Sequence, residues 1–286
     1  MNMLAFFYAF ASAVLMGTVG IFSKITGLPA EIITFFRLMI GAFFLLFFLM
    51  ARGELKILRA WPGWPVIING FFLAGFIIFY VQAMNYTSMA NAIMLVYLAP
   101  LTASIIAHFF LNERLNMPST ALIFIAVFGF AMMMEFNLEL SRSSREFIGL
   151  CYGMTASFSY TGFILVNRLI KPEIHVYVRT YYQLLTGAVV MIPFMISGLG
   201  LIQPSHLGWL VGVGLLPGFL GILFAVIALS RLPAATFCTI AYVEPVAVVI
   251  FGWTIFAEKL SLLQMAGCLL IIGAGVSKVL LARYQK

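Results

Sequence analysis

Long apolar runs separated by short polar links make up nearly the whole chain. Each run is close to the length, about 20 residues, that an α-helix needs to cross the hydrocarbon core of a bilayer. The runs are 3–24, 30–51, 64–87, 90–111, 118–136, 147–168, 174–198, 207–231, 234–257 and 262–282. This pattern predicts an all-α membrane protein with ten transmembrane helices.

Composition agrees with the pattern and excludes several classes of protein. Hydrophobic residues make up 64% of the 286 residues and charged residues only 9%, whereas soluble proteins carry about 25% charge. So few charges cannot form the dense basic face that nucleic-acid binding requires, so no nucleic-acid partner is expected. The lipid bilayer is the expected surrounding of the chain.

Enzymatic chemistry finds little support. The chain contains no Asp, which excludes a paired-aspartate intramembrane protease, and it carries neither HExxH nor GxSxG. A GxxxxGK[ST] phosphate loop is also absent, so we expect no ATP hydrolysis and no cofactor. No metal site is expected, because His108, His175 and His206 lack ligand spacing.

Charge asymmetry between the links predicts the orientation of the chain. An even number of helices places both termini on one side of the membrane. With the N-terminus in the cytoplasm, the outer links carry four basic residues, Lys24, Arg142, Arg145 and Lys259. The inner links then carry ten, Arg52, Lys56, Arg59, Arg114, Arg168, Lys171, Arg231, Lys278, Arg283 and Lys286. The positive-inside rule therefore favours cytoplasmic termini.

The chain repeats itself at an offset of 145 residues. The stretch Tyr97-Leu98-Ala99-Pro100-Leu101 returns as Tyr242-Val243-Glu244-Pro245-Val246, and Glu113-Arg114-Leu115 returns as Glu258-Lys259-Leu260. Lys24 and Arg168 correspond at nearly the same offset. Two five-helix units, 1–140 and 145–286, are predicted. Since five is odd, the second unit is inverted in the membrane, which is typical of transporters with a site at the midplane between the repeats.

These features resemble the EamA family of the drug/metabolite transporter superfamily. The resemblance rests on a Pro in the fourth helix of each half, Pro100 and Pro245, on the Glu-basic-Leu turns, and on Arg37 in Phe35-Phe36-Arg37-Leu38. It implies ten helices and the movement of small metabolites, often amino-acid export. One departure is Met16-Gly17, where relatives often have Trp-Gly. We expect a multi-pass protein of a bacterial cytoplasmic (inner) membrane.

Two charged residues lie deep within predicted spans. Glu244 is the one carboxylate near the middle of a span, where a charge costs on the order of 3 kcal/mol. It is the candidate for proton coupling, and the alternative is that it only holds the helix bend beside Pro245. Arg37 lies in the second span without a carboxylate near it. It is interpreted either as a structural clamp or as an anion-binding group.

Polar and aromatic residues of several spans complete the predicted substrate site. On the sixth helix, Gly153, Ser157, Tyr160, Ile164 and Asn167 share one face that should look into the bundle. The predicted substrate-binding residues are Tyr80, Gln82, Asn85, Tyr97, Ser157, Tyr160, Tyr242 and Glu244. Each single polar group could instead serve only as a hydrogen bond between helices.

The leading hypothesis is a secondary transporter for a small organic metabolite, and the favoured substrate is an amino acid or related zwitterion. It would act by alternating access, as an exporter or a proton-linked exchanger, and as a monomer or homodimer. The alternatives are an organic-cation or drug exporter, a lipid-linked flippase, and, from another class, an intramembrane enzyme.

Overall fold

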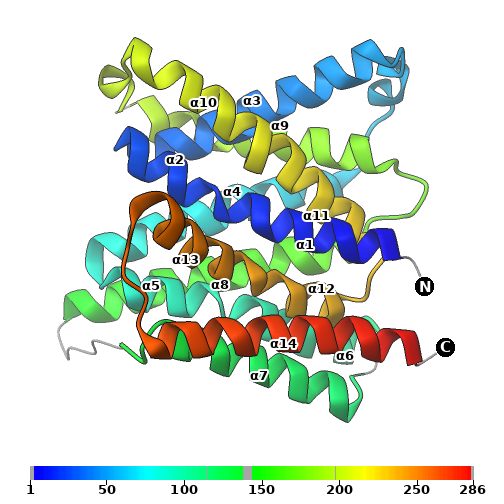
Figure 1. Ribbon diagram of the computed structural model, residues 1–286. Coiled ribbons are helices and arrows are strands. Elements are labelled where there is room, and N and C mark those ends of the chain that lie inside the picture. The colour runs from blue at the N-terminus through cyan, green and yellow to red at the C-terminus, as the bar shows by residue number, and fades with distance from the viewer. Residues whose placement is uncertain (1–2, 114, 138–143, 197, 285–286) are drawn as a thin grey trace.

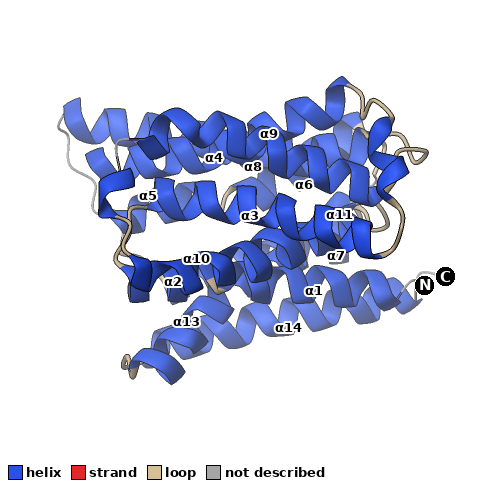
Figure 2. Ribbon diagram, turned by 90° about the horizontal axis from the view of Figure 1, so that it is seen from above, coloured by secondary structure: helices blue, strands red, loops and turns tan. Residues whose placement is uncertain are grey.

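The computed structural model describes residues 3–113, 115–137, 144–196 and 198–284. Within these ranges the chain consists of helices joined by short links, and it contains no strand. The helices run side by side along one direction, and links gather at the two ends of the bundle (Figure 2). The start of the first helix and the end of the last lie at the same end (Figure 1). We call this the terminal end, and the other the distal end.

All ten predicted runs are helical, and most of their ends agree with the prediction to within a few residues. The helices are α1 (Met3–Gly17), α2 (Val19–Thr26), α3 (Ala30–Ala51), η1 (Leu55–Arg59), α4 (Trp64–Tyr86), α5 (Met89–Val96), α6 (Ala99–Phe110), α7 (Met117–Met133), α8 (Ser144–Leu169), α9 (Val176–Ile196), η2 (Leu199–Leu201), η3 (Pro204–His206), α10 (Leu207–Val213), η4 (Gly214–Gly221), α11 (Ile222–Leu229), α12 (Ala234–Ala241), α13 (Val243–Phe256) and α14 (Leu262–Tyr284).

The sequence pattern predicts ten uninterrupted helices, but in the structure four of these runs are interrupted or irregular. The first is interrupted at Thr18, between α1 and α2, and the eighth contains the π-helical segment η4. The fourth and ninth are interrupted at Tyr97 and Tyr242, so that Pro100 and Pro245 fall in the first turns of α6 and α13. Proline is tolerated there because a first-turn amide has no partner within the helix.

Eight spans in the described residues are long and apolar enough to cross a membrane. They are Met3–Thr26, Ala30–Ala51, Trp64–Tyr86, Asn91–Phe110, Ser144–Leu169, Pro204–Leu229, Ala234–Phe256 and Leu262–Leu281. α7 is apolar but shorter, and α9 is helical but is not among the eight. The protein is therefore an integral, multi-pass membrane protein.

The first and second halves of the chain are interleaved rather than side by side. α1 packs against α11 and α13, and α8, the first helix of the second half, packs against α4 and α5. In the same way α3 packs against η4 while α9 packs against α4. The remaining large contacts pair α3 with α9, α6 with α12 and α7 with α14. Most of the core therefore lies between the halves.

Some sequence predictions fall outside the described residues. These are Arg114 of the first Glu-basic-Leu turn, Arg142 and Lys286 among the charges used for orientation, and residues 140–143 of the predicted boundary between the halves at 140–145.

Candidate functional site

A central cavity of about 420 Å³ lies between the two halves of the chain. Its wall is formed by α1 to α5, α8 and α11 to α13, and most of the side chains in it are apolar. The cavity runs from the middle of the bundle toward the distal end, where Ser23, Met84 and Met89 line it. Met89 is 62% exposed, so it marks the rim of the opening.

Two charged side chains, Arg37 and Glu244, face this cavity from opposite halves of the chain. Arg37 lies in α3 and is only 7% exposed, and its Nε has no hydrogen-bond partner in the described residues. Glu244, in the first turn of α13, is half-buried and interacts electrostatically with Arg37. The two groups are not in direct contact as an ion pair. The site thus offers one positive and one negative group, each able to bind an oppositely charged ligand.

Local backbone features hold both charged groups in place. The interruption at Tyr242 begins α13 just before Glu244, which places this carboxyl at the helix start instead of mid-helix. Gly17 lets α1 approach α13 closely, because a Cβ added to Gly17 would lie 3.1 Å from the carbonyl oxygen of Glu244. On the other side, a Cβ on Gly218 would lie 2.2 Å from the carbonyl oxygen of Arg37. Small residues therefore set the position of both helices at the site.

Aromatic rings form much of the wall beside the charged pair. Tyr80 and Phe76 of α4 line the cavity together with Tyr97 and Tyr160. The rings of Phe76 and Tyr160 stack with their centroids 5.2 Å apart, and Tyr97 packs on Phe130 at 4.7 Å. Such rings accommodate an apolar side chain and also attract a cationic group.

The sequence profile of the EamA-like transporter family matches this chain twice, at residues 3–135 and 147–277. The chain belongs to this family. Family membership identifies it as a membrane transporter of the drug/metabolite superfamily, and it points to transport rather than catalysis.

Several relatives cover the chain nearly end to end. The uncharacterized transporter YxxF of Bacillus subtilis (strain 168) is 26% identical over 280 residues, which are 96% of this chain and 89% of that protein. An uncharacterized transporter of Archaeoglobus fulgidus is 25% identical over 269 residues, 93% of this chain and 92% of its own. One crystal structure, at 22% identity, superposes with a TM-score of 0.85 over 98% of both chains, so the two share a fold.

In this EamA-family chain the cavity brings together five of the residues selected from the sequence. Tyr80, Tyr97, Tyr160, Glu244 and Arg37 all line it. They come from α3, α4, α8, α13 and the α5–α6 break. Residues far apart in the sequence, from both halves, therefore meet at one site.

Four other selected residues lie elsewhere. Gln82 is half-buried and Asn85 is exposed, and neither lines the cavity. Ser157 is buried, at 7% exposure, and does not line the cavity. Tyr242 is fully buried and donates a hydrogen bond from its hydroxyl to the carbonyl oxygen of Tyr97, with 2.6 Å between the oxygens. Tyr242 thereby joins the helix break of one half to the corresponding break of the other.

Sequence reasoning missed the contribution of α1 to the cavity. Ser12, Met16 and Ser23 line it from α1 and α2, and Ser12 Oγ also donates to the carbonyl of Gly221 at 2.8 Å. The serines at i and i+11 on one face of an apolar run were the available signal. No cluster of metal-ligating side chains occurs in the part of the chain that the structure describes.

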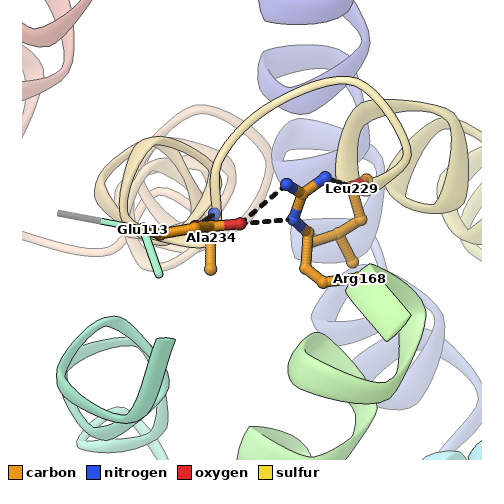
Figure 3. Close-up of polar contacts among 4 residues, drawn as sticks. All are labelled: Glu113, Arg168, Leu229 and Ala234. Atoms are coloured by element: carbon orange, nitrogen blue, oxygen red, sulfur yellow. Dashed lines mark hydrogen bonds and ion pairs between the residues drawn. The ribbon is translucent and has the colours of Figure 1, made fainter. Parts of the chain in front are cut away.

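The terminal end beyond the cavity is closed by a polar network. Glu113 accepts hydrogen bonds from Arg168 at 2.7 Å and from the backbone amide of Ala234 at 2.6 Å (Figure 3). Arg168 also donates to the carbonyl of Leu229 at 2.9 Å. The Glu113 and Arg168 side chains are only 13% and 23% exposed. The network joins the end of α6 to α8, α11 and α12.

Proposed function

We propose that this chain is a secondary transporter that moves an amino acid or a related zwitterion across the membrane by alternating access. The observation that carries the proposal is the central cavity in which Arg37 and Glu244 lie within one aromatic, largely apolar wall. A guanidinium binds a carboxylate and a carboxylate binds an ammonium group, while the rings contact the substrate's side chain. A cavity of about 420 Å³ falls in the range of small-molecule sites.

The proposed architecture is ten spans in two inverted five-helix units, 1–140 and 145–286. It is supported by the double match of the family profile and by the interleaved packing. In this packing the larger contacts between spans have counterparts when the two units exchange places, as with α1 on α11 and α8 on α4. The start of α1 and the end of α14 lie at the same end of the bundle, which fits an even number of spans. We further propose that this end is cytoplasmic, as the basic residues of its links favour.

Glu244 is the proposed proton-coupling residue. A carboxyl group that faces a cavity open to one side can exchange a proton with that side, and it is costly to leave charged when the cavity closes. Substrate and proton would then each bias the equilibrium between the two open states. Moving such an equilibrium from 1:99 to 99:1 takes about 5.5 kcal/mol of differential binding.

The test is uptake of a panel of amino acids into proteoliposomes with the purified protein, with and without a pH gradient. We expect Glu244→Gln to fold and to lose the dependence of uptake on pH. The matched control is Glu135→Gln, which changes an exposed carboxyl outside the cavity and should keep that dependence. Unaltered pH dependence in Glu244→Gln would rule out the coupling role.

A second candidate, an organic-cation exporter, is favoured by the combination of Glu244 with Tyr80, Tyr97 and Tyr160 in the wall. The two candidates make opposite predictions for Arg37→Gln. A zwitterion loses the partner of its carboxylate, so its binding weakens by about tenfold or more. A cation loses a repulsive neighbour, so its binding is unchanged or tighter. Binding measured by thermal stabilisation of the purified variant distinguishes them.

A further inference from the structure

The two Glu-basic-Leu turns of the sequence lie at opposite ends of the bundle, and each bonds a basic residue of the other half. Glu113, at the terminal end, bonds Arg168. Glu258, at the distal end, bonds Lys24. Because Glu113 corresponds to Glu258 and Lys24 nearly to Arg168 in the 145-residue repeat, the two pairs are versions of one contact.

The two versions differ in burial and in bonding. At the terminal end the carboxylate and guanidinium also bind the Ala234 amide and the Leu229 carbonyl. At the distal end both side chains are about half exposed, at 51% for Lys24 and 53% for Glu258. Within the described residues neither of these two side chains makes a second hydrogen bond, and the one further contact of the Lys24 ammonium group there is with the ring of Phe256, 4.3 Å from its centroid. The terminal-end pair is therefore buried and held by additional backbone hydrogen bonds, whereas the distal-end pair is exposed and lacks them.

The repeat explains what the loose pair lacks. Subtracting 145 from Leu229 and Ala234 gives Met84 and Met89, two residues that line the distal mouth of the cavity. The Met89 amide and the Met84 carbonyl therefore correspond to the backbone groups that the terminal-end network binds. At the distal end neither is bound by Glu258 or Lys24. A closed distal end would bring the Met89 amide to Glu258 and the Met84 carbonyl to Lys24.

We propose that Glu113–Arg168 and Glu258–Lys24 are paired latches, one at each end, which close in alternation. A latch is closed when its carboxylate caps the start of the span that follows a short turn, α12 or α5, and its basic residue binds the end of the span before that turn, α11 or α4. The structure is then the state with the terminal latch closed and the distal latch open. This inference rests on the proposed alternating access, and it names the residues that hold each state.

The chain supplies a matched pair of reporters for this proposal. Cys238 is fully buried, and its counterpart in the repeat, Ile93, lines the open cavity. If the ends exchange roles, Cys238 should become accessible to water when Ile93 becomes buried. Labelling of Cys238 is measured in a variant with Cys151→Ala and Cys268→Ala. Labelling at position 93 is measured in a variant with Ile93→Cys in which all three native cysteines are replaced by Ala.

The experiment measures labelling rates of each reporter by a water-soluble maleimide, on purified protein in lipid nanodiscs. We expect Glu113→Gln and Arg168→Gln to raise the labelling rate of Cys238 by about tenfold or more, which corresponds to about 1.4 kcal/mol in the equilibrium, and to lower that of Ile93→Cys. Glu258→Gln, the matched control, should leave Cys238 protected. Glu113→Asp, which keeps the charge, gives an intermediate rate.

Folding is verified for each variant by its gel-filtration profile and by a cooperative thermal transition. The proposal is overturned if folded Glu113→Gln and Arg168→Gln leave Cys238 as protected as before. It is equally overturned if Glu258→Gln exposes Cys238 as much as they do, since that would indicate general loosening. The readout is access of water, not transport, so a protein that fails to carry amino acids but shows these rates contradicts only the proposed substrate.

Discussion

Substitution of Gly218 by Ala tests whether close packing of the π-helical segment η4 fixes the position of Arg37. An added Cβ would lie 2.2 Å from the Arg37 carbonyl oxygen and 3.1 Å from its carbonyl carbon. Ordinary contacts of this kind begin at about 3.4 Å, so one helix must move by about 1 Å. Both atoms belong to backbone, and no side chain can rotate away. Overpacking of this kind costs about 1–3 kcal/mol, and it displaces the guanidinium in the cavity.

The assay is thermal unfolding of the purified protein in detergent, together with stabilisation by a bound substrate. Gly218→Ala should unfold at a lower temperature and bind substrate more weakly. The matched control is Gly208→Ala in α10, where an added Cβ meets nothing within 4 Å. That change should be neutral or stabilising, because Ala has a higher helix propensity than Gly by up to about 1 kcal/mol. Equal stability of Gly218→Ala and the parent would refute the reasoning.

Two further predictions concern buried polar groups outside the cavity. Lys278 is 5% exposed and donates a hydrogen bond to Ser119 Oγ at 2.6 Å. Ser119→Ala should therefore destabilise the protein by about 1–3 kcal/mol, because it leaves a buried ammonium group without its partner. Adding Lys278→Met should restore most of that loss, and a double variant no more stable than Ser119→Ala would contradict the pairing. Asn69 is fully buried, and neither its Oδ1 nor its Nδ2 makes a hydrogen bond with the described residues. Asn69→Leu should therefore raise the unfolding temperature. A lower unfolding temperature would instead mean that the Asn69 amide binds buried water.

The spans could be predicted from the sequence because their ends are set by hydropathy and by turn residues. The second span was predicted at 30–51 and is observed as α3, Ala30–Ala51. The interruptions could not be predicted in this way, because a break at Tyr242 leaves hydropathy unchanged. Pro245 was a visible signal, but it was interpreted as lying within a helix, whereas it lies in the first turn of a new one.

The cavity residues were harder to predict than the spans. Arg37 and Glu244 stood out because a charge within an apolar run is rare. Gln82 and Asn85 were selected for their polarity, but neither side chain lines the cavity. Ser12 was not predicted, because two serines on one face are a weak signal in a helix that is otherwise apolar on nearly all sides. The facing direction of such a helix depends on partners about 200 residues away.

The interleaved packing of the halves has a consequence for biosynthesis. The Ser12 hydroxyl bonds the carbonyl of Gly221, 209 residues later, and Lys24 bonds Glu258, 234 residues later. During translation, the first helix therefore enters the lipid long before the ribosome has made the segments that cover it. The early helices have to remain inserted with their polar groups facing lipid or provisional neighbours, so native assembly is a late event that begins only when the chain is nearly complete.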